Sequence, residues 1–306
     1  MRGGRSLILN ADDFGYSPEV NAAVLKAHRE GPLTSASLMV TEPGFAEAVE
    51  IARRNPALGV GLHVVTTYDH ALLPPSELPL LAGPDGKFGA DPLRMGLRYA
   101  FSRPARRQLQ QEMAAQFARF AQTGLPWSHA DGHQHFHLHP AVWDIFLSLC
   151  LEYGVHRVRI PQEEILAHRR DGGDRALIQL FAALVFRALG RRARRAMRRA
   201  EGQGAPPFFV CDRVYGLLQT GQMDRRYSLR LLERLQGKVN EVYFHPGSPH
   251  AHPLPEAERA DGVRDVELAA LLTSELRVQI AARGLQLCTY AEAEMKQVRD
   301  SSQPQG

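Results

Sequence analysis

Residues 6–31 of the chain read SLILNADDFGYSPEVNAAVLKAHREG. The apolar run Ser6–Asn10 predicts a short buried β-strand. A helix is expected over Pro18–Glu30, because Ser17 is a natural N-cap, a proline follows at the first helical position and Gly31 ends the apolar stripe. A strand that leads directly into a helix is the repeating unit of a parallel α/β fold.

The same alternation continues along the 306 residues. Seven further runs with strand character follow, at Ser35–Thr41, Gly59–Val65, Trp127–His133, Arg157–Pro161, Phe208–Val214, Val239–His245 and Leu285–Tyr290. Helical patterns lie between most of them, at Gly44–Arg54, Ala105–Thr123, Pro140–Tyr153 and Val266–Gly284. Eight strands that alternate with helices favour an irregular (β/α) barrel of about seven to eight mostly parallel strands over an open sheet.

Two segments interrupt the alternation and are expected to be insertions. Residues 68–99 are rich in Pro and Gly, and residues 162–207 carry a run of arginines. About 150 residues per domain is usual, but single α/β barrels of about 250 residues are common. Since the chain has no internal repeat and no linker-like stretch, we expect one domain over residues 1–306, with a disordered tail over residues 300–306.

Composition excludes several classes of protein. Charged residues make up 23% and hydrophobic residues 44% of the chain, which is typical of a soluble globular protein rather than a disordered one. Three cysteines, Cys150, Cys211 and Cys288, are too few for a disulfide framework or a cysteine-based zinc site. Every apolar run is too short for a signal peptide or a membrane span, so we expect a protein of the reducing cytoplasm.

Acidic residues and histidines follow four of the predicted strands. Their sequences are Asn10-Ala11-Asp12-Asp13-Phe14-Gly15, Gly61-Leu62-His63, Asp131-Gly132-His133-Gln134-His135-Phe136-His137-Leu138-His139 and His245-Pro246-Gly247. Each alone has an ordinary structural explanation, since an Asp pair often caps a turn and a single histidine in a strand is usually a hydrogen-bonded core residue. The carboxyl ends of parallel strands meet at one end of a barrel, however, and four such ends together favour a shared site.

The combination suits a divalent metal ion. Two imidazoles and one carboxylate can hold the ion and leave positions open for water and substrate. The ion lowers the pKa of its water and polarises a carbonyl, while a second carboxylate can take up the proton of the water. The side chains of neighbouring residues at the end of a strand have different directions. One aspartate of the pair can therefore face the ion while the other faces the water. A histidine on the opposite wall, such as His245, could protonate the leaving group of an amide or ester.

These motifs, in this order, resemble those of the YdjC-like carbohydrate deacetylases. The resemblance extends from about Ser6 to Tyr290, and its most specific part is the string Asn-Ala-Asp-Asp-Phe-Gly combined with the histidine-rich string. It implies an irregular (β/α) barrel. It also implies the metal-dependent removal of the acetyl group from an N-acetylated amino sugar.

The resemblance implies roles for individual residues. The implied metal ligands are Asp13, His63 and His133, with Asp12 as the general base and His245 as the general acid. One divalent ion is implied, with zinc or magnesium placed first and manganese, cobalt or iron as alternatives. Two imidazoles and a carboxylate suit zinc, manganese, cobalt and iron, whereas magnesium prefers oxygen ligands.

Other residues near the predicted strand ends are expected in supporting positions. Asp131 is expected to hold an imidazole rather than bind the ion, and His135 is expected to lie next to the ligands. Arg159 and Tyr215 lie near the ends of the fifth and sixth predicted strands and are expected to contact the substrate. Ion pairing and packing explain these two residues equally well.

Part of the sequence points to one branch of the family. The first strand, the segment Ser17–Val40 and the segment His135–Pro140 look closest to the branch associated with hopanoid biosynthesis. That branch implies an N-acetylglucosaminyl hopanoid, which is a lipid-linked sugar, as the substrate. A homodimer is expected at the level of the family only.

The basic charge of the chain is local. Seven arginines fall within thirteen residues, at Arg187, Arg191, Arg192, Arg194, Arg195, Arg198 and Arg199, and the other 30 Lys and Arg residues are fewer than the 33 Asp and Glu residues. The segment Ala176–Ala200 predicts one or two helices, broken or bent near Gly190. A basic helix face is often simply solvated, and peripheral contact of Phe186–Arg199 with anionic lipid is the functional alternative.

Three other functions fit the sequence less well than deacetylation. Two histidines and one carboxylate also bind iron in non-haem oxygenases, but those usually have a β-sandwich-like fold and would leave Asp12 without a task. A phosphodiester hydrolase on a similar barrel would often bind two or three ions. Nucleic-acid binding by the arginine run is not expected, because neither an aromatic platform nor a recognised binding motif accompanies it.

Overall fold

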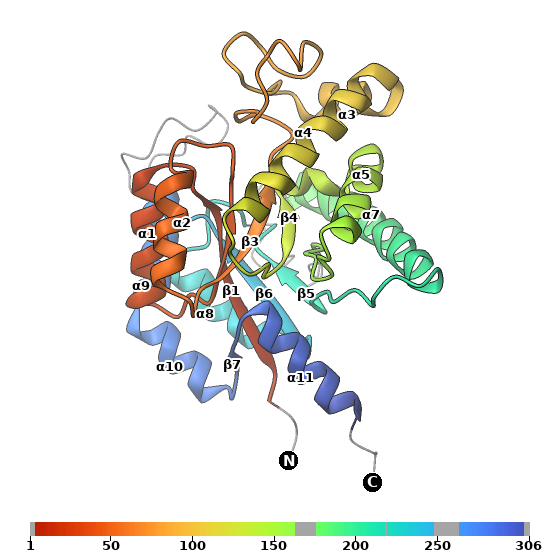
Figure 1. The fold of residues 1–306 in the computed structure, drawn as a ribbon. Coiled ribbons are helices and arrows are strands. Elements are labelled where there is room, and N and C mark those ends of the chain that lie inside the picture. Colours follow the sequence, from red (N-terminus) through yellow and green to blue (C-terminus); the bar gives the residue numbers. More distant parts are fainter. Residues whose placement is uncertain (1–3, 163–175, 218, 248–262, 303–306) are drawn as a thin grey trace.

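The computed structural model describes residues 4–162, 176–217, 219–247 and 263–302 of the chain. Seven strands lie within these ranges: β1 (Ser6–Phe14), β2 (Ser35–Leu38), β3 (Gly59–Val64), β4 (Ala130–Gly132), β5 (Arg213–Tyr215), β6 (Val239–Phe244) and β7 (Gln286–Leu287). The strands pair in parallel in the order β4-β3-β2-β1-β6-β5, with β7 beside the start of β1. The predicted α/β class with a mostly parallel sheet is therefore confirmed (Figure 1).

The sheet curls, and its two edge strands, β4 and β5, are connected through isolated β-bridges to a segment that lies between them. Residues 157–161, predicted as a strand, form only isolated parallel bridges, in which Val158 pairs with Ala130 of β4 and Arg157 pairs with Phe209. Phe209 lies in the segment that leads into β5, the other edge of the sheet. The proline that ends this segment has no N–H to continue a ladder. The irregular barrel is thus as expected, with one predicted strand reduced to bridges.

Helices cover the outside of the barrel. Within the described ranges they are α1 (Pro18–Arg29), α2 (Phe45–Arg54), α3 (Pro92–Phe101), α4 (Arg103–Gln122), the 3₁₀ helix η1 (His133–Leu138), α5 (Pro140–Glu152), α7 (Ala176–Gly202), α8 (Arg225–Arg234), α9 (Val263–Leu272), α10 (Ser274–Ala282) and α11 (Tyr290–Ser302). The first helix begins at the predicted cap, because the Ser17 hydroxyl accepts a hydrogen bond from the Val20 amide. Figure 1 shows α1 and α2 on one side of the sheet and α5 and α7 on the other.

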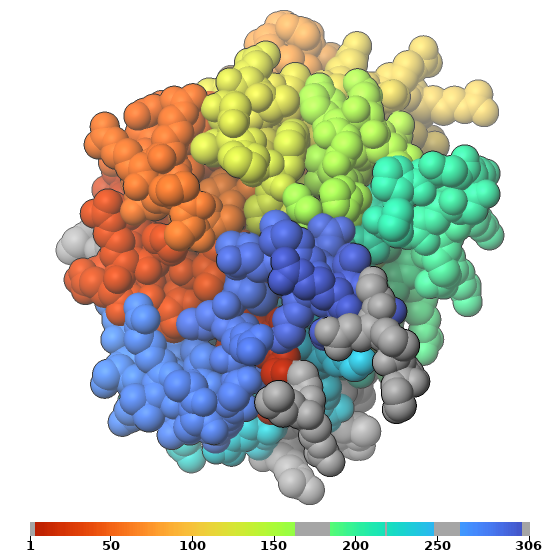
Figure 2. Space-filling view, turned by 60° about the horizontal axis from the view of Figure 1, so that its bottom comes forward, coloured from red at the N-terminus to blue at the C-terminus, as the bar shows by residue number. Residues whose placement is uncertain are grey.

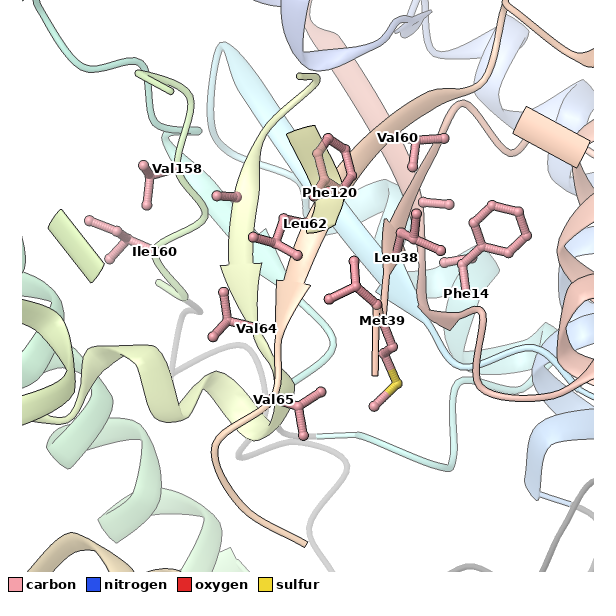
Figure 3. Packing of buried hydrophobic residues seen from close by; sticks show 14 of the residues in the cluster. Phe14, Leu38, Met39, Val60, Leu62, Val64, Val65, Phe120, Val158 and Ile160 are labelled. Carbon is pink, nitrogen blue, oxygen red and sulfur yellow. The ribbon is translucent and has the colours of Figure 1, made fainter. Parts of the chain in front are cut away.

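Neighbouring residues of β1 face opposite sides of the sheet. Leu7 and Leu9 belong to the large core with the apolar stripe of α1, whereas Ile8 belongs to a second cluster with residues of β6 and the C-terminal segment. Figure 3 shows part of the large core, in which side chains of β1, β2 and β3 pack with Phe120 of α4 and with Val158 and Ile160. Because Asn10 and Asp12 share the face of Ile8, the alternation directs these two polar residues into the barrel.

The first predicted insertion, residues 68–99, contains most of α3 and lies at the end of the barrel opposite to the start of β1 (Figure 1). This is the end at which the carboxyl ends of the parallel strands meet. The other end is covered by C-terminal helices, and Figure 2 shows α10 and α11 gathered there. The insertion therefore lies on the side of the barrel where a site is expected.

Two details of the C-terminal half differ from expectation. The helix α7 runs through Gly190 without interruption, and a Cβ at that position would lie 3.0 Å from Ile160 Cγ2, so the glycine permits close packing instead of breaking the helix. Of the tail expected to be disordered, residues up to Ser302 belong to α11, and residues 303–306 lie outside the described residues, as do residues 163–175 of the second insertion. Among the described helices, none combines the length and apolar character needed to cross a lipid bilayer.

Candidate metal centre

The aspartate pair lies at an irregular point of β1. The register with β2 shifts between Ala11 and Phe14, and Asp13 has a φ of 62°. A positive φ is uncommon for a residue other than glycine, and such strained positions cluster at functional sites. The irregularity gives Asp13 partners different from those of Asp12.

Asp13, His63 and His133 come together from segments far apart in the chain. His63 lies in β3, and His133 is the first residue of η1. The Asp13 Oδ1 atom is 3.5 Å from His63 Nε2 and 3.2 Å from His133 Nδ1, and one donor atom of each side chain lies within 4.8 Å of the other two. All three residues are buried. Two imidazoles and one carboxylate at these separations fit a single divalent ion such as zinc.

Each of the two imidazoles has a carboxylate at a second nitrogen. The Asp131 Oδ1 atom lies 2.7 Å from His63 Nδ1, which is the position expected for a residue that holds an imidazole. The Asp69 Oδ2 atom lies 3.2 Å from His133 Nε2. A carboxylate in this position fixes the orientation of the ring and raises the basicity of the nitrogen that faces the metal.

Asp69, which no sequence motif marks, reaches the centre from the first insertion. Its neighbour Tyr68 has a φ of 67°, and the Phe88 amide donates a hydrogen bond to the Asp69 carbonyl oxygen at 3.0 Å. The next amide, of His70, donates to the Glu42 carboxylate at 2.9 Å. The loop is thus fixed both to the rest of the insertion and to the segment that follows β2. Only the folded loop brings this carboxylate to the centre, so spacing along the sequence does not reveal it.

The second carboxylate oxygen of Asp13 has a cationic partner. Arg264 of α9 donates a hydrogen bond to Asp13 Oδ2 at 2.7 Å. Burial by itself raises the pKa of Asp13, but the charge of Arg264 and the contact with His133 outweigh it and hold the pKa well below its usual range. Asp13 is therefore ionised at neutral pH, which is the state in which a carboxylate binds a metal.

A second set of donor atoms, from Asp12, His63 and Asp131, is also close enough to hold an ion. Two of these groups are already paired with Arg159, whose Nη1 atom lies 2.8 Å from Asp12 Oδ2 and 2.6 Å from Asp131 Oδ2. A divalent ion there would meet a buried positive charge and compete with it for both carboxylates. In the other set Arg264 occupies only Oδ2 of the single carboxylate, Asp13, and leaves Oδ1 facing the two imidazoles, so that set is the better candidate for a metal centre.

Asp12 lies beside this ligand set. Its Oδ1 atom accepts a hydrogen bond from Asn10 Nδ2 at 2.8 Å, and its Oδ2 atom accepts one from Arg159 Nη1 at 2.8 Å. His245 Nε2 is 4.0 Å from the same Oδ2 atom. A carboxylate held by fixed donors next to the three ligands has the position that a general base needs.

His245 follows β6 and has a second acidic neighbour. Glu267 of α9 accepts a hydrogen bond from the His245 amide, and its Oε2 atom is 3.8 Å from His245 Nδ1. Burial by itself lowers the pKa of His245, but the interaction with Glu267 and the charges of Asp13 and Asp12 raise it above its usual value. The imidazolium form, which a general acid requires, is favoured in these surroundings. Like Asp69 and Arg264, Glu267 belongs to no motif seen in the sequence.

Arg159, expected as a substrate contact, has a different environment. Its side chain is fully buried, and its guanidinium pairs with Asp12 of β1, Asp131 of β4 and Glu241 of β6, the last at 2.7 Å. A guanidinium enclosed by three carboxylates joins three strands and leaves no exposed surface for a sugar. Its geometry suits a residue that positions Asp12.

Tyr215, the other expected substrate contact, lies away from the centre. The residue is 2% exposed, and its hydroxyl accepts a hydrogen bond from the Gln236 amide at 3.3 Å. Gln236 precedes β6, whereas His245 follows it. The hydroxyl of Tyr215 therefore points toward the end of the barrel opposite to the metal centre, and the geometry does not support contact with a substrate there.

The histidine-rich string turns sharply after His133. The two residues that follow it have φ values of 53° and 54°. The Nε2 atom of His135 lies 2.9 Å from the Tyr243 hydroxyl, and that of His137 lies 3.0 Å from the Arg159 carbonyl oxygen. The turn sends successive imidazoles in different directions. Within the described ranges, only the first histidine of the string joins the ligand set.

These features define a class of protein, an irregular (β/α) barrel with a candidate metal centre at the carboxyl ends of its strands. Residues 6–282 match the family model of the YdjC-like proteins, and the chain belongs to this family, as its motifs indicated. A carbohydrate deacetylase of Geobacillus stearothermophilus is 32% identical over 94% of this chain and 98% of that protein. A carbohydrate deacetylase of Brevibacillus brevis is 43% identical, over 51% of this chain and 59% of that protein.

A solved structure shares the fold across the whole chain. A crystal structure of a protein from Enterococcus faecalis superposes with a TM-score of 0.68 over 95% of this chain and 99% of that chain. The two sequences are 22% identical. At this level of identity the likeness extends to the fold alone.

Proposed function

We propose that this chain is a metal-dependent carbohydrate deacetylase, which removes the acetyl group from an N-acetylated amino sugar. The observation that carries the proposal is the cluster of Asp13, His63 and His133 with Asp12 beside it. Family relatives that are named carbohydrate deacetylases, one of them matched over 94% of this chain, support the class of substrate. When bound, the ion supplies a water of lowered pKa and polarises the acetamide carbonyl.

In this proposal, two residues beside the ligand set carry out the two proton transfers. Asp12 accepts the proton of the attacking water, and the hydrogen bonds from Asn10 and Arg159 keep its carboxylate in place. His245 approaches Asp12 from the neighbouring strand end and donates a proton to the leaving amine. The products are acetate and the free amino sugar.

The finer proposal for the substrate is an N-acetylglucosaminyl hopanoid. It rests on the resemblance of the first strand and of the segments Ser17–Val40 and His135–Pro140 to the hopanoid-associated branch. The last of these segments overlaps η1, which begins two residues earlier with the proposed ligand His133. A lipid-linked sugar would bring a cytoplasmic enzyme to the inner surface of a membrane.

Peripheral membrane contact through α7 belongs to the same proposal. Arg187, Arg191 and Arg195 are exposed and four residues apart, so they form one basic stripe along the helix. Phe186 instead packs edge-on against His135, with ring centroids 5.8 Å apart, and is not part of this stripe. Replacing the three arginines by alanine should weaken flotation of the protein with anionic vesicles. A homodimer stays a prediction from the family.

The alternative enzyme classes have less support. An iron oxygenase would leave the held carboxylate of Asp12 without a task. A phosphodiester hydrolase that binds two or three ions would need more free carboxylates, whereas Asp12 and Asp131 are paired with Arg159. Nucleic-acid binding gains no support from the names of the relatives.

The direct test measures metal content and acetate release on the same preparations. The protein should hold one divalent ion per chain and release acetate from diacetylchitobiose, from an N-acetylglucosaminyl lipid or from both. His63→Ala and His133→Ala should lose both the ion and the activity, and His156→Ala, remote from the centre, should keep both. The proposal fails if the wild-type protein releases acetate at an unchanged rate after complete removal of metal.

A further inference from the structure

The helix α3, which begins in the first insertion and ends two residues beyond it, carries an apolar stripe that faces solvent. Leu93, Leu97 and Phe101 follow one another at intervals of four residues on α3, and their exposed fractions are 73%, 52% and 83%. On the opposite side of the helix, Met95 and Tyr99 are buried, and the Tyr99 hydroxyl donates to the Thr66 carbonyl oxygen at 2.7 Å. The helix is thus anchored on one side and presents large apolar side chains on the other. Aligned apolar side chains at such exposure usually mark an interaction surface.

The surroundings of this stripe are cationic. Residues 92–111 contain five arginines and no Asp or Glu. Four of these arginines, Arg94, Arg103, Arg106 and Arg107, are exposed. Asp91 directly precedes α3 and is committed to the helix cap, where it accepts a hydrogen bond from the Arg94 amide at 3.0 Å. The apolar stripe is therefore bordered mainly by positive charge.

The cationic border continues toward α7. Burial, and after it the charges of Arg192 and Arg106, lower the pKa of His139, so arginines of α7 and α4 both lie near this residue. Arg192 donates a hydrogen bond to the Pro140 carbonyl oxygen at 3.2 Å and also pairs with the exposed carboxylate of Asp144 on α5 at 3.5 Å, so its charge is partly balanced there. Figure 1 shows α3, α5 and α7 along one side of the molecule. The two basic regions thus belong to one surface.

We propose that α3 is an interfacial helix that docks the protein on an anionic lipid bilayer. Leu93, Leu97 and Phe101 enter the boundary between headgroups and acyl chains, and the surrounding arginines contact phosphate groups. The charge pattern favours a membrane over a second copy of the chain, because a symmetric dimer through this face would bring the same arginines against each other. The insertion that carries α3 also supplies Asp69 to the candidate metal centre. Docking through α3 therefore places the site-bearing end of the barrel near the bilayer.

Tryptophan fluorescence tests the insertion of the stripe directly. Phe101→Trp places an indole in the stripe, and Val278→Trp places one on α10, at a position of 61% exposure, as the matched control. Vesicles of phosphatidylglycerol and phosphatidylcholine should shift the emission of the Phe101→Trp variant to the blue and leave the control unchanged. Vesicles of phosphatidylcholine alone should give a smaller shift. Equal emission of both variants with and without anionic vesicles overturns the proposal.

Flotation of the protein without introduced tryptophans on anionic vesicles gives an independent test. Combined substitution Leu93→Ser, Leu97→Ser and Phe101→Ser should reduce the partition coefficient on anionic vesicles by about 100-fold or more, because three apolar side chains no longer leave water. Val278→Ser should change nothing. An unchanged coefficient in the triple variant overturns the proposal, as does a wild-type dimer that the triple substitution makes monomeric. Neither assay involves turnover, so failure here leaves the deacetylase proposal intact.

Discussion

Asp12 and Asp13 are neighbours in the chain, yet the irregular end of β1 gives them separate partners. Asp13 faces the imidazoles of His63 and His133, whereas Asp12 is held by Asn10 and Arg159 at the side of this set. One aspartate can therefore bind an ion while the other stays available for a proton. This separation is the smallest structural unit on which the proposed mechanism depends.

Asp12→Asn should reduce the rate of acetate release by about 10²- to 10⁴-fold, because an amide cannot accept the proton of the water. The variant should still hold one ion per chain, since Asp12 lies outside the favoured ligand set. Acetate release and metal analysis of the same sample check both parts. Turnover at the wild-type rate would mean that another residue is the base.

Asp69→Ala should weaken metal binding by about 10- to 100-fold, because His133 loses the carboxylate that orients its ring. Asp69→Asn should have a smaller effect, since its amide oxygen can still accept a hydrogen bond from the ring. Asp85→Asn, in the same insertion but exposed, is the control. Titration against a chromophoric chelator measures the dissociation constants. The same affinity in all four proteins would show that Asp69 has no part in the centre.

At the scale of elements, β1, β4 and β6 are joined inside the barrel by one buried cation. Arg159 contacts Asp12, Asp131 and Glu241, and the Tyr290 hydroxyl donates to Glu241 from α11. Burial by itself lowers the pKa of Arg159, but the three carboxylates raise it well above its usual value, so the guanidinium stays charged. Removing a partner from such a group leaves buried charges unpaired.

Arg159→Met should therefore lower the free energy of unfolding by about 3–5 kcal/mol. Arg54→Met, on the exposed face of α2, should have little effect and serves as the control. Urea unfolding of the metal-free proteins measures both changes. A loss below about 1 kcal/mol for Arg159→Met, the size typical of a surface ion pair, would contradict the network.

The helices and strands that the sequence predicts correctly are those with a strong periodicity of apolar residues or a clear capping residue. The strand that opens the chain and the helix after Ser17 fall where the sequence places them, because apolar alternation and capping are local properties. The gathering of Asp12, Asp13, His63 and His133 follows in turn, since parallel strands bring their carboxyl ends together.

The residues that sequence does not reveal depend on tertiary packing. Asp69 arrives through an irregular insertion, and Arg264 and Glu267 arrive on α9, whose place against the barrel no motif encodes. For Arg159 the sequence leaves ion pairing and substrate contact open, and it does not name the three carboxylate partners, because they lie on three different strands. Spacing along the chain carries no information about such contacts.

For the whole molecule, buried histidines make the fold sensitive to acid. Burial is the main cause that lowers the pKa of His129 to about 3 and that of His137 to about 4, and it also holds the pKa of His135 well below its usual value. In the unfolded chain these groups take up protons below a pH of about 6.5. Because their folded pKa values are depressed, the stability they contribute is present above that pH and is lost as the pH falls toward the folded values.

The metal-free protein should thus lose on the order of 2 kcal/mol per buried histidine between pH 7 and pH 5. The raised pKa of His245 has the opposite effect, since it stabilises the fold as the pH falls. The three buried histidines with depressed pKa values outweigh this single group. Urea midpoints at pH 7, 6 and 5 in the presence of a chelator measure the loss. His137→Gln should reduce the change of the urea midpoint with pH. A midpoint of the wild-type protein that stays constant from pH 7 to pH 5 would contradict the predicted loss of stability.

The proposed activity depends on the binding of a single cation by Asp13, His63 and His133. Anomalous diffraction from crystals grown with zinc tests this most directly. We expect one strong peak at about 2.0–2.3 Å from the Asp13 carboxylate and from one nitrogen of each imidazole, with Asp12 beyond bonding distance. A peak bound instead by Asp12, His63 and Asp131, or the absence of any peak at this end of the barrel, would contradict the claim.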